Sequence, residues 1–257
     1  HAPAAALVDP AAGSVLSIAE ALTNIVWAPL RDGLESVSLS ANWMWPCKNP
    51  GEDARLYKAV EACSNFACEL GVNIPTGKDS LSMTQKYGQD KVLAPGTVII
   101  SAGAEVSDIR RIVSPVLVNK KDTYIYHVDF SFDNLKLGGS ALAATLNKLG
   151  AEVPTVKDAA YFADAFEVIQ ELINKNLVLA GHDISEGGLI TALLEMCFAN
   201  TKGGLNVNLK EIPEESLTKV LFSENPGVVI QVEKKSEVEK ILQNAGVGFA
   251  KIGVPTD

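Results

Sequence analysis

The sequence predicts an α+β fold in which helices cover one face of a sheet. Segments with helical and strand-like patterns alternate along the 257 residues, as expected when both kinds of element share a core. The strand-like segments are short, and Leu205–Leu209 alternates polar and apolar residues. This alternation is typical of a half-buried antiparallel sheet, whereas the strands of a doubly wound parallel sheet are buried on both faces.

The N-terminal half opens with a clear amphipathic pattern. Val15, Ile18 and Leu22 recur at helical spacing, which predicts a helix over Ser14–Ala28 with Ser14 as its cap. The further elements expected in this half are a strand at Ser36–Leu39, a helix at Glu52–Leu70 that Gly71 ends, and strands at Ser80–Gln85 and Thr97–Ala104.

A change of character near Ser107–Pro115 marks the expected domain boundary. The stretch SDIRRIVSP interrupts the apolar pattern with charges and ends in a proline, so we place one domain at residues 1–112 and the other at 113–257. The elements expected beyond it are strand Thr123–Asp129, helices Gly139–Leu149 and Ala159–Asn174, strand Leu177–Ala180, helix Gly188–Ala199, strand Leu205–Leu209, helix Glu214–Phe222, strand Gly227–Val232, helix Ser236–Asn244 and strand Gly248–Ile252.

Composition and charge exclude several classes of protein. Lys and Arg number 22 against 31 Asp and Glu, so the net charge is -9 and binding to nucleic acid or to an anionic membrane is not expected. No apolar run reaches the ~18–20 residues of a membrane span, and the N-terminus lacks the pattern of a signal peptide. We expect a soluble, cytoplasmic protein. A first residue His1 in place of Met indicates a processed chain or an excised piece.

The cysteines carry no recognisable chemistry. Cys47, Cys63, Cys68 and Cys197 form no CxxC pair and have no His at zinc-ligand spacing. We interpret them as small apolar residues of a reduced protein, and we assign no catalytic residue among them.

Two glycine-containing segments follow predicted strands and precede predicted helices. In the first, the backbone N–H groups of Gly138, Gly139 and Ser140 could bind a phosphate at a helix N-terminus. On this segment alone, the better interpretation is an ordinary helix start that Ser140 caps.

The second glycine segment is richer in polar side chains. In it, Asp183 could hold a hard cation and Ser185 could hydrogen-bond a phosphate. The structural alternative is that both residues cap the next helix while His182 is a hydrogen-bonded core histidine. Because so many polar groups are clustered within nine residues, we favour a functional site here.

Two further features are weaker. Glu20 and Asn24 are four residues apart and share one face of the first helix, an arrangement that suits Mg²⁺ but is more commonly a solvated surface. Lys78 follows Gly77 as in a nucleotide-binding loop. However, the first glycine of that motif is missing and Asp79 stands where Ser or Thr belongs, so phosphate contact and an ordinary turn are about equally supported.

Taken together, the segments resemble the large form of phosphoribosylformylglycinamidine synthase, also called formylglycinamide ribonucleotide amidotransferase, of purine biosynthesis. The resemblance runs from end to end of the chain. It rests on LVDPAAG (Leu7–Gly13), AEALTNIVWA (Ala19–Ala28), LSANWMW (Leu39–Trp45), PGEDARLYKAV (Pro50–Val60), IPTGKDSLSM (Ile74–Met83), LGGSALA (Leu137–Ala143), GHDISEGGL (Gly181–Leu189) and LFSENPG (Leu221–Gly227).

This resemblance implies two domains of the aminoimidazole ribonucleotide synthetase type, from the second half of the family's synthetase region, with the first domain truncated. It also implies a structural Mg–ADP site in which Glu20, Asn24 and Asp183 bind Mg²⁺ and Ser185 contacts the nucleotide. A further metal-binding Asp of the family would lie upstream of His1. ATP-driven chemistry and the glutaminase with its Cys nucleophile would belong to the remaining domains of the same enzyme, so the fragment would be silent alone.

Two alternatives stay open at this point. One is a stand-alone ATP-dependent synthetase or kinase of the same superfamily, and the other is a scaffold that binds no nucleotide. Convergence of Glu20, Asn24, Asp183 and Ser185 on one cleft would favour a nucleotide site. Apolar surface left uncovered by missing domains could also allow a homodimer.

Overall fold

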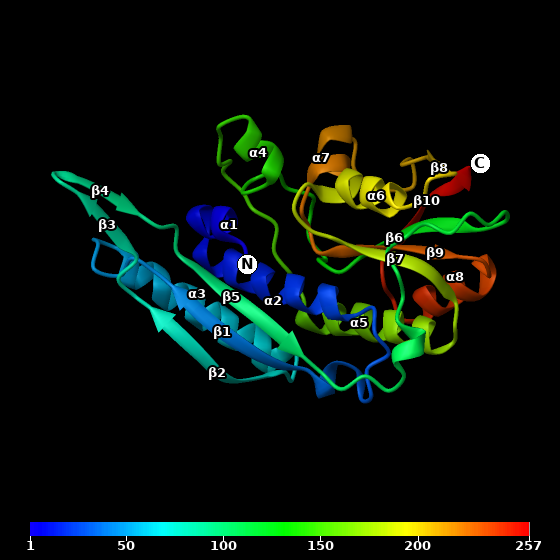
Figure 1. Cartoon of the computed structure of the whole chain (residues 1–257), viewed down its shortest axis with the longest axis horizontal. Coiled ribbons are helices and arrows are strands. Elements are labelled where there is room, and N and C mark those ends of the chain that lie inside the picture. Colours follow the sequence, from blue (N-terminus) through cyan, green and yellow to red (C-terminus); the bar gives the residue numbers. More distant parts are fainter. Residues whose placement is uncertain (257) are drawn as a thin grey trace.

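The computed structural model describes residues 1–256 and shows two parts, each built of helices and strands, that lie side by side (Figure 1). The N-terminal part contains α1 (Pro3–Val8), α2 (Pro10–Ile25), the 3-10 helix η1 (Gly33–Ser36), β1 (Ser38–Met44), α3 (Glu52–Glu69), β2 (Asn73–Ser80), β3 (Thr84–Tyr87), β4 (Asp90–Leu93), β5 (Thr97–Gly103) and η2 (Ile109–Arg111). The C-terminal part contains β6 (Tyr124–Asp129), α4 (Ala141–Thr145), α5 (Ala159–Asn174), β7 (Val178–Ile184), α6 (Gly188–Phe198), β8 (Gly204–Val207), α7 (Leu217–Phe222), β9 (Gly227–Val232), α8 (Lys235–Asn244) and β10 (Phe249–Thr256).

The N-terminal part is a small mixed sheet packed against two helices. Its strand order is β2-β1-β5, with β1 parallel to β2 and antiparallel to β5. Helices α2 and α3 pack against each other, and α2 also contacts β5. The hairpin β3-β4 projects away from this sheet (Figure 1).

The C-terminal part is a five-stranded sheet in the order β7-β9-β6-β10-β8, in which every neighbouring pair is antiparallel. The expected α+β class is confirmed, but the expectation of a single helix-covered face is wrong for this sheet. Val228 and Ile230 of β9 join a core with α5 and α8, whereas Val229 joins a core with α6 and α7. All residues of β9 are buried, as expected of a nearly continuous apolar strand in a sheet covered on both faces, and its one polar side chain, Gln231, forms hydrogen bonds with Val118 and Thr123.

The first long helix begins earlier than expected. Asp9 caps α2 by accepting the N–H groups of Ala11 and Ala12, and Pro10 occupies the first helical position. The predicted cap, Ser14, instead lies inside the helix, where its buried hydroxyl donates to the carbonyl oxygen of Ala59 at 2.8 Å.

Other differences arise where distant strands pair. Ile74–Ser80, for which phosphate contact and an ordinary turn were about equally supported, lies in strand β2 (Asn73–Ser80) because β1 pairs with it. A Cβ on Gly77 would collide with the carbonyl oxygen of Ala41, so only glycine allows this approach. Strand β7 runs on to Ile184 because β9 pairs with it along that length, so Asp183 lies within the strand.

Two helices are shorter than expected, and several elements are confirmed. Helix α4 covers only Ala141–Thr145 because Asn147 and Gly150 take positive φ angles of 54° and 85°. Helix α7 starts at Leu217, capped by Ser216. Helices α3, α5, α6 and α8 and strands β5, β6 and β9 lie within one residue of their expected positions. No helix within residues 1–256 is both long and apolar enough to cross a membrane.

The two parts share one continuous core. Phe162 on α5 lies 5.7 Å from Phe66 of α3 and 5.3 Å from Phe130, measured between ring centroids, with edge-to-face geometry in both pairs. Such pairs add to the stabilisation from buried area. The ring of Trp27 lies against Gly181, where any Cβ would overlap it. The apolar packing therefore continues across the seam between the parts.

One buried amide satisfies the backbone at this seam. Gln170 on α5 accepts the N–H of Leu30 at 2.9 Å and donates to the carbonyl oxygens of Val26 at 2.6 Å and Ala28 at 3.0 Å. The side chain is 3% exposed, so water cannot replace it as a partner for those backbone groups.

We predict that Gln170→Leu lowers the free energy of unfolding by roughly 2–3 kcal/mol, because similar volume is kept while three backbone groups lose their partner. Urea denaturation followed by circular dichroism measures the change. Gln243→Leu, on the exposed side of α8, is the matched control and should cost less than ~0.5 kcal/mol. Equal midpoints for the two variants would contradict the assigned role of Gln170.

Candidate functional site

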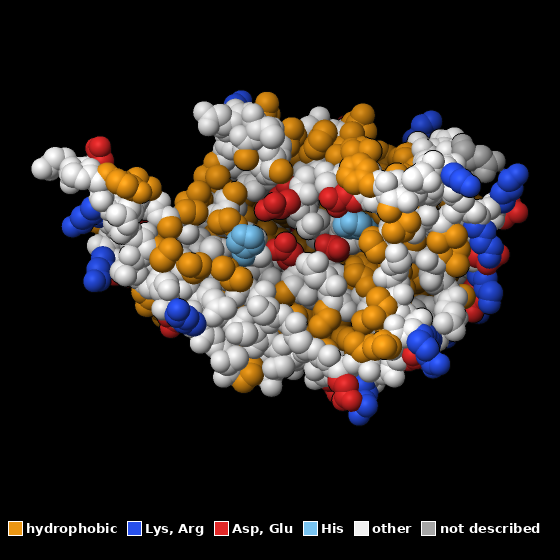
Figure 2. Space-filling view, viewed as in Figure 1, with side chains coloured by type: hydrophobic (Ala, Val, Ile, Leu, Met, Phe, Trp, Pro, Cys, Tyr) orange, Lys and Arg blue, Asp and Glu red, His pale blue; other side chains and the backbone are white. Residues whose placement is uncertain are grey.

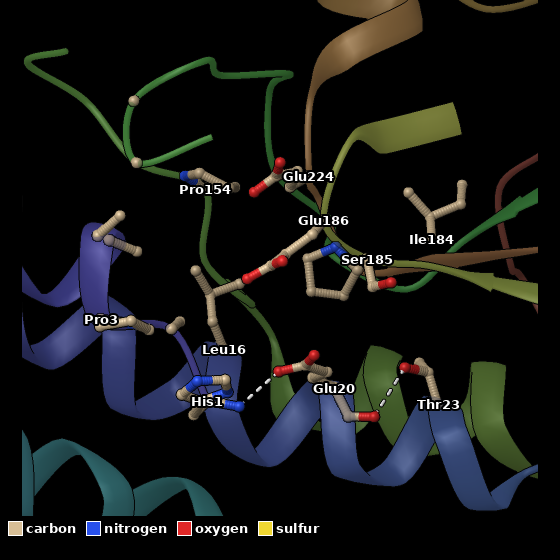
Figure 3. A pocket seen from close by; sticks show the side chains of 16 residues that line it. His1, Pro3, Leu16, Glu20, Thr23, Pro154, Ile184, Ser185, Glu186 and Glu224 are labelled. Atoms are coloured by element: carbon tan, nitrogen blue, oxygen red, sulfur yellow. Dashed lines mark hydrogen bonds and ion pairs between the residues drawn. The ribbon is translucent and has the colours of Figure 1, made fainter. Parts of the chain in front are cut away.

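A cleft opens at the seam between the two parts, and its walls come from four segments. Its volume is about 90 Å³. Figure 2 shows acidic side chains gathered around a hollow in the middle of this face. The lining residues are His1–Ala5, then Leu16, Glu20 and Thr23 of α2, then Gly138, Gly139 and Pro154, and finally Ile184, Ser185, Glu186, Glu224 and Pro226 (Figure 3).

Glu20 faces the cleft from α2. Leu16, Glu20 and Thr23 are spaced by about one helical turn, so the three side chains lie on the same side of the helix. The Glu20 carboxylate lies 2.6 Å from the amino group of His1 and is 33% exposed. The position remains open to solvent.

Asp183 approaches from β7 on the other side of the seam. Its side chain is 13% exposed, and burial raises the pKa of its carboxyl. The Asp183 backbone N–H and His182 act in the opposite direction, whereas the charges of Glu20 and Glu195 raise the pKa further. Because the charge of Glu20 acts on the pKa of Asp183, the fold places these residues of the two parts near each other.

His182 is held at both ring nitrogens. Its Nδ1 lies 2.8 Å from the carbonyl oxygen of Asp183, and its Nε2 lies 3.2 Å from the carboxylate of Glu195 on α6. This matches the alternative expectation of a hydrogen-bonded histidine. The other expectation for this segment, that Asp183 or Ser185 caps the next helix, is wrong because Gly187 is the N-cap of α6 and no side chain caps it.

The glycine segment at 138–140 does not present free backbone donors. The N–H of Gly138 donates to Glu152, that of Gly139 to Leu149 and that of Ser140 to Leu137, all at carbonyl oxygens. The Ser140 hydroxyl caps α4 by accepting the N–H of Ala143, and Ser140 is buried. The phosphate-binding role expected of these N–H groups is therefore not available in this arrangement, and the alternative of an ordinary cap describes Ser140.

Glu224 is a site residue that the sequence did not single out. It lies between α7 and β9 and accepts the N–H groups of Ala141 and Gly187, both at 2.8 Å. Burial raises the pKa of Glu224, and the charges of Glu186 and Glu20 act in the same direction, against the two hydrogen bonds. Only its place in the segment LFSENPG pointed to it, since both donors are distant in the chain.

Two expected site residues lie away from the cleft. Asn24 is exposed, donates its amide N–H to the carbonyl oxygen of Glu20 at 2.8 Å, and does not line the cleft. Lys78 lies on the exposed strand β2 and likewise does not line it. Within residues 1–256, no three His, Cys, Asp or Glu side chains form a group that could hold a metal ion. Of the expected residues, Glu20 and Ser185 line the cleft, whereas Asp183 does not line it and lies close enough for the charge of Glu20 to raise the pKa of its carboxyl.

Two family models match the chain. One is described as the FGAR-AT PurM_N-like domain and covers residues 1–105, and the other as the C-terminal domain of AIR synthase related protein and covers residues 127–257. The chain therefore belongs to the AIR synthase-related family and has an N-terminal domain of the FGAR-AT type. The predicted boundary between residues 112 and 113 falls in the interval that neither model covers, and it stays a prediction.

Curated relatives narrow this family further. The chain is 42% identical over 90% of its length to a probable phosphoribosylformylglycinamidine synthase, chloroplastic/mitochondrial, from Arabidopsis thaliana. It is 40% identical over 98% of its length to the phosphoribosylformylglycinamidine synthase of Homo sapiens. The chain spans only 16% and 19% of the lengths of these proteins. The family resemblance stated from the motifs is confirmed.

Solved structures show the same fold at low sequence identity. The structure titled T. maritima PurL complexed with FGAR matches all of the chain with a TM-score of 0.75 and 15% identity, over 41% of that protein. T. maritima PurL complexed with ATP matches 99% of the chain with a TM-score of 0.71 and 14% identity, over 38% of that protein. The expected synthetase-like fold is confirmed by this likeness.

We predict that Asp183→Asn stabilises the folded chain at pH 7 by roughly 1 kcal/mol. Because the folded-state pKa of Asp183 is raised, protonated Asp183 favours the folded state at low pH. That advantage is lost as the pH rises from the ordinary carboxyl pKa through the raised one. The gain from Asn should therefore shrink toward pH 4 in urea melts. Asp90→Asn, on the exposed strand β4, is the control, and a gain from Asp183→Asn that does not change with pH would refute this account.

Proposed function

We propose that this chain is the part of a phosphoribosylformylglycinamidine synthase that holds a magnesium-bound nucleotide, ADP or ATP, at the seam between its two parts. The supporting observation is that Glu20 and Ser185 line one cleft although they come from different parts, with the Asp183 carboxyl near enough to Glu20 for that charge to raise its pKa. The relatives bear this enzyme's name over nearly all of the chain. Structures of the same fold carry titles that name ATP, ADP and AMPPCP as ligands.

The acidity of the cleft supports a metal-bound ligand in preference to a free anion. Glu20, Glu186 and Glu224 line the cleft and, with Asp183 close to Glu20, would repel an unaccompanied polyphosphate. Carboxylate oxygens are the ligands that Mg²⁺ prefers, and this ion usually keeps waters and phosphate oxygens for its other positions. A bound Mg²⁺ would therefore supply the positive charge that the nucleotide needs.

The donor set fits such a cation only in part. Glu20 and Asp183 would hold it through hard oxygens, and the amide oxygen of Asn24 would have to turn toward the cleft to join them. Because the described residues contain no ready-made metal cluster, the nucleotide's own phosphates would complete the coordination.

The size of the cleft adds one requirement. Ligand pockets commonly have volumes of roughly 300–1,000 Å³, whereas this cleft offers about 90 Å³. The segment His1–Ala5 forms one wall of the cleft. We infer that this segment moves aside when a nucleotide enters, and that Ser185 then contacts the phosphates. Gly138 and Gly139 would line the site without donating N–H groups, and Lys78 would have no part in it.

The whole enzyme proposed here is the ATP-dependent ligase that converts formylglycinamide ribonucleotide to its amidine with glutamine as the nitrogen donor. The nucleotide in this chain would be structural, and the chemistry and the glutaminase would lie in the enzyme's remaining domains, which are the partners we propose. The share of 16–20% of the curated relatives agrees with this division. Cytoplasmic location and a homodimer of the isolated chain are further parts of the proposal.

We predict that calorimetric titration with Mg–ADP detects one site per chain. Glu20→Gln and Asp183→Asn should each weaken binding about tenfold or more, because each removes a charged oxygen ligand. Glu69→Gln, at the exposed C-terminal end of α3, should leave the affinity unchanged. Absence of binding by the wild-type chain would favour a scaffold that holds no nucleotide.

We also predict that the isolated chain does not convert formylglycinamide ribonucleotide in the presence of ATP, Mg²⁺ and ammonia. A coupled assay for ADP release measures this, with an intact synthase as the positive control. Turnover well above background would overturn the proposed structural role and favour a stand-alone synthetase.

A further inference from the structure

Glu224 links two chain segments that both border the cleft. Its Oε1 atom accepts the N–H of Ala141, the first residue of α4, and the N–H of Gly187, the N-cap of α6. These donors are 83 and 37 residues away from Glu224 in the sequence. Figure 3 shows the Glu224 side chain above the cleft, on the side opposite Glu20.

The turn that carries Ser185 needs such an external contact. Gly187 and Gly188 have φ angles of 91° and 75°, and no side chain caps α6. Within the turn, the backbone bond from Gly188 to Ser185 spans 3.0 Å. The Gly187 N–H donates its hydrogen bond to Glu224. This carboxylate therefore orients the turn relative to the rest of the cleft.

The contact is also built to be firm. Two hydrogen bonds from backbone N–H groups converge on one oxygen of Glu224, each with a donor–acceptor distance of 2.8 Å. The surroundings restrict Glu224 further, because a Cβ on Gly188 would collide with the backbone of Leu221 and Phe222, just before Glu224. The chain around Glu224 therefore packs directly on the turn that it holds.

We propose that Glu224 is a positioning residue for the nucleotide site, which it serves by tying the Ser185–Gly188 turn to the start of α4. This inference rests on the proposed nucleotide function. Through Gly187, Glu224 holds Ser185, together with its chain neighbours Ile184 and Glu186, on the wall that faces Glu20. Its role is exerted through hydrogen bonds to backbone N–H groups, so a neutral side chain with an oxygen in the same place would perform it.

The first arm of the test measures the two segments directly. Hydrogen–deuterium exchange is compared for the wild-type chain, Glu224→Ala and Glu224→Gln. The Gln amide oxygen can accept both N–H groups, whereas Ala removes the acceptor. We expect the amides of Ala141 and Gly187 to exchange about tenfold faster in the Ala variant and near the wild-type rate in the Gln variant. If the Ala variant does not fold, Glu224→Asp, which is too short to reach both donors, takes its place.

The second arm measures Mg–ADP affinity by calorimetry. We expect about tenfold weaker binding by Glu224→Ala, or by its Asp substitute, and wild-type affinity for Glu224→Gln. Glu214→Ala is the matched control, since Glu214 also accepts a backbone N–H, that of Ser216 at 2.9 Å, but outside the cleft. It should leave both the affinity and the two exchange rates unchanged.

Three results would overturn the role proposed for Glu224. Unchanged Mg–ADP affinity in Glu224→Ala would mean that the turn does not need the hydrogen bond to Glu224. Equal weakening in Glu224→Gln would mean that charge matters and not the hydrogen bonds, and tighter binding in Glu224→Ala would mean that the carboxylate competes with phosphate. Absence of Mg–ADP binding by the wild-type chain would instead overturn the proposed function, and the exchange comparison would then decide by itself whether Glu224 orders the two segments.

Discussion

The packing of α5 against the N-terminal part is the contact on which the rest of this structure depends. Phe162 completes aromatic pairs on both sides of the seam. Gln170 supplies the partners that the backbone between Val26 and Leu30 would otherwise lack. Apolar burial drives this docking, and the buried amide makes it specific because any other alignment would leave polar groups unpaired. The docking also sets the position of α2 relative to β7, and with it the cleft.

The cleft collects negative charge that the fold does not neutralise. Asp183 and Glu224 are both largely removed from water, and the pKa of each is raised by burial and by neighbouring carboxylates. Such an arrangement costs folding free energy. Carboxylates with pKa values perturbed in this way are typical of functional sites. The large core that the two parts share offsets this cost in folding free energy.

Local patterns predicted the elements whose stability is local. Helices α3 and α5 carry strong amphipathic repeats, and the structure places them within one residue of expectation. The predictions were wrong where pairing between strands far apart in the sequence decides the backbone conformation. Asn73–Ser80 is a strand because β1 lies beside it, and β7 continues through Asp183 because β9 does. A polar, turn-like sequence adopts an extended conformation when a neighbouring strand satisfies its backbone.

The candidate site shows the same division between what the sequence predicts and what only the tertiary structure decides. Residue type and spacing favoured Asp183 and Ser185, since a carboxylate and a hydroxyl near glycine turns are recognisable chemistry, whereas Glu20 and Asn24 were assigned through the family resemblance. The sequence could not show that the N–H groups of Gly138–Ser140 are already engaged or that Glu224 joins two segments. Hydrogen-bond partners far apart in the chain are chosen by packing, and packing is a property of the whole fold. The kinds of side chain at the cleft could therefore be predicted from the sequence, whereas the hydrogen bonds that connect its segments depend on tertiary contacts.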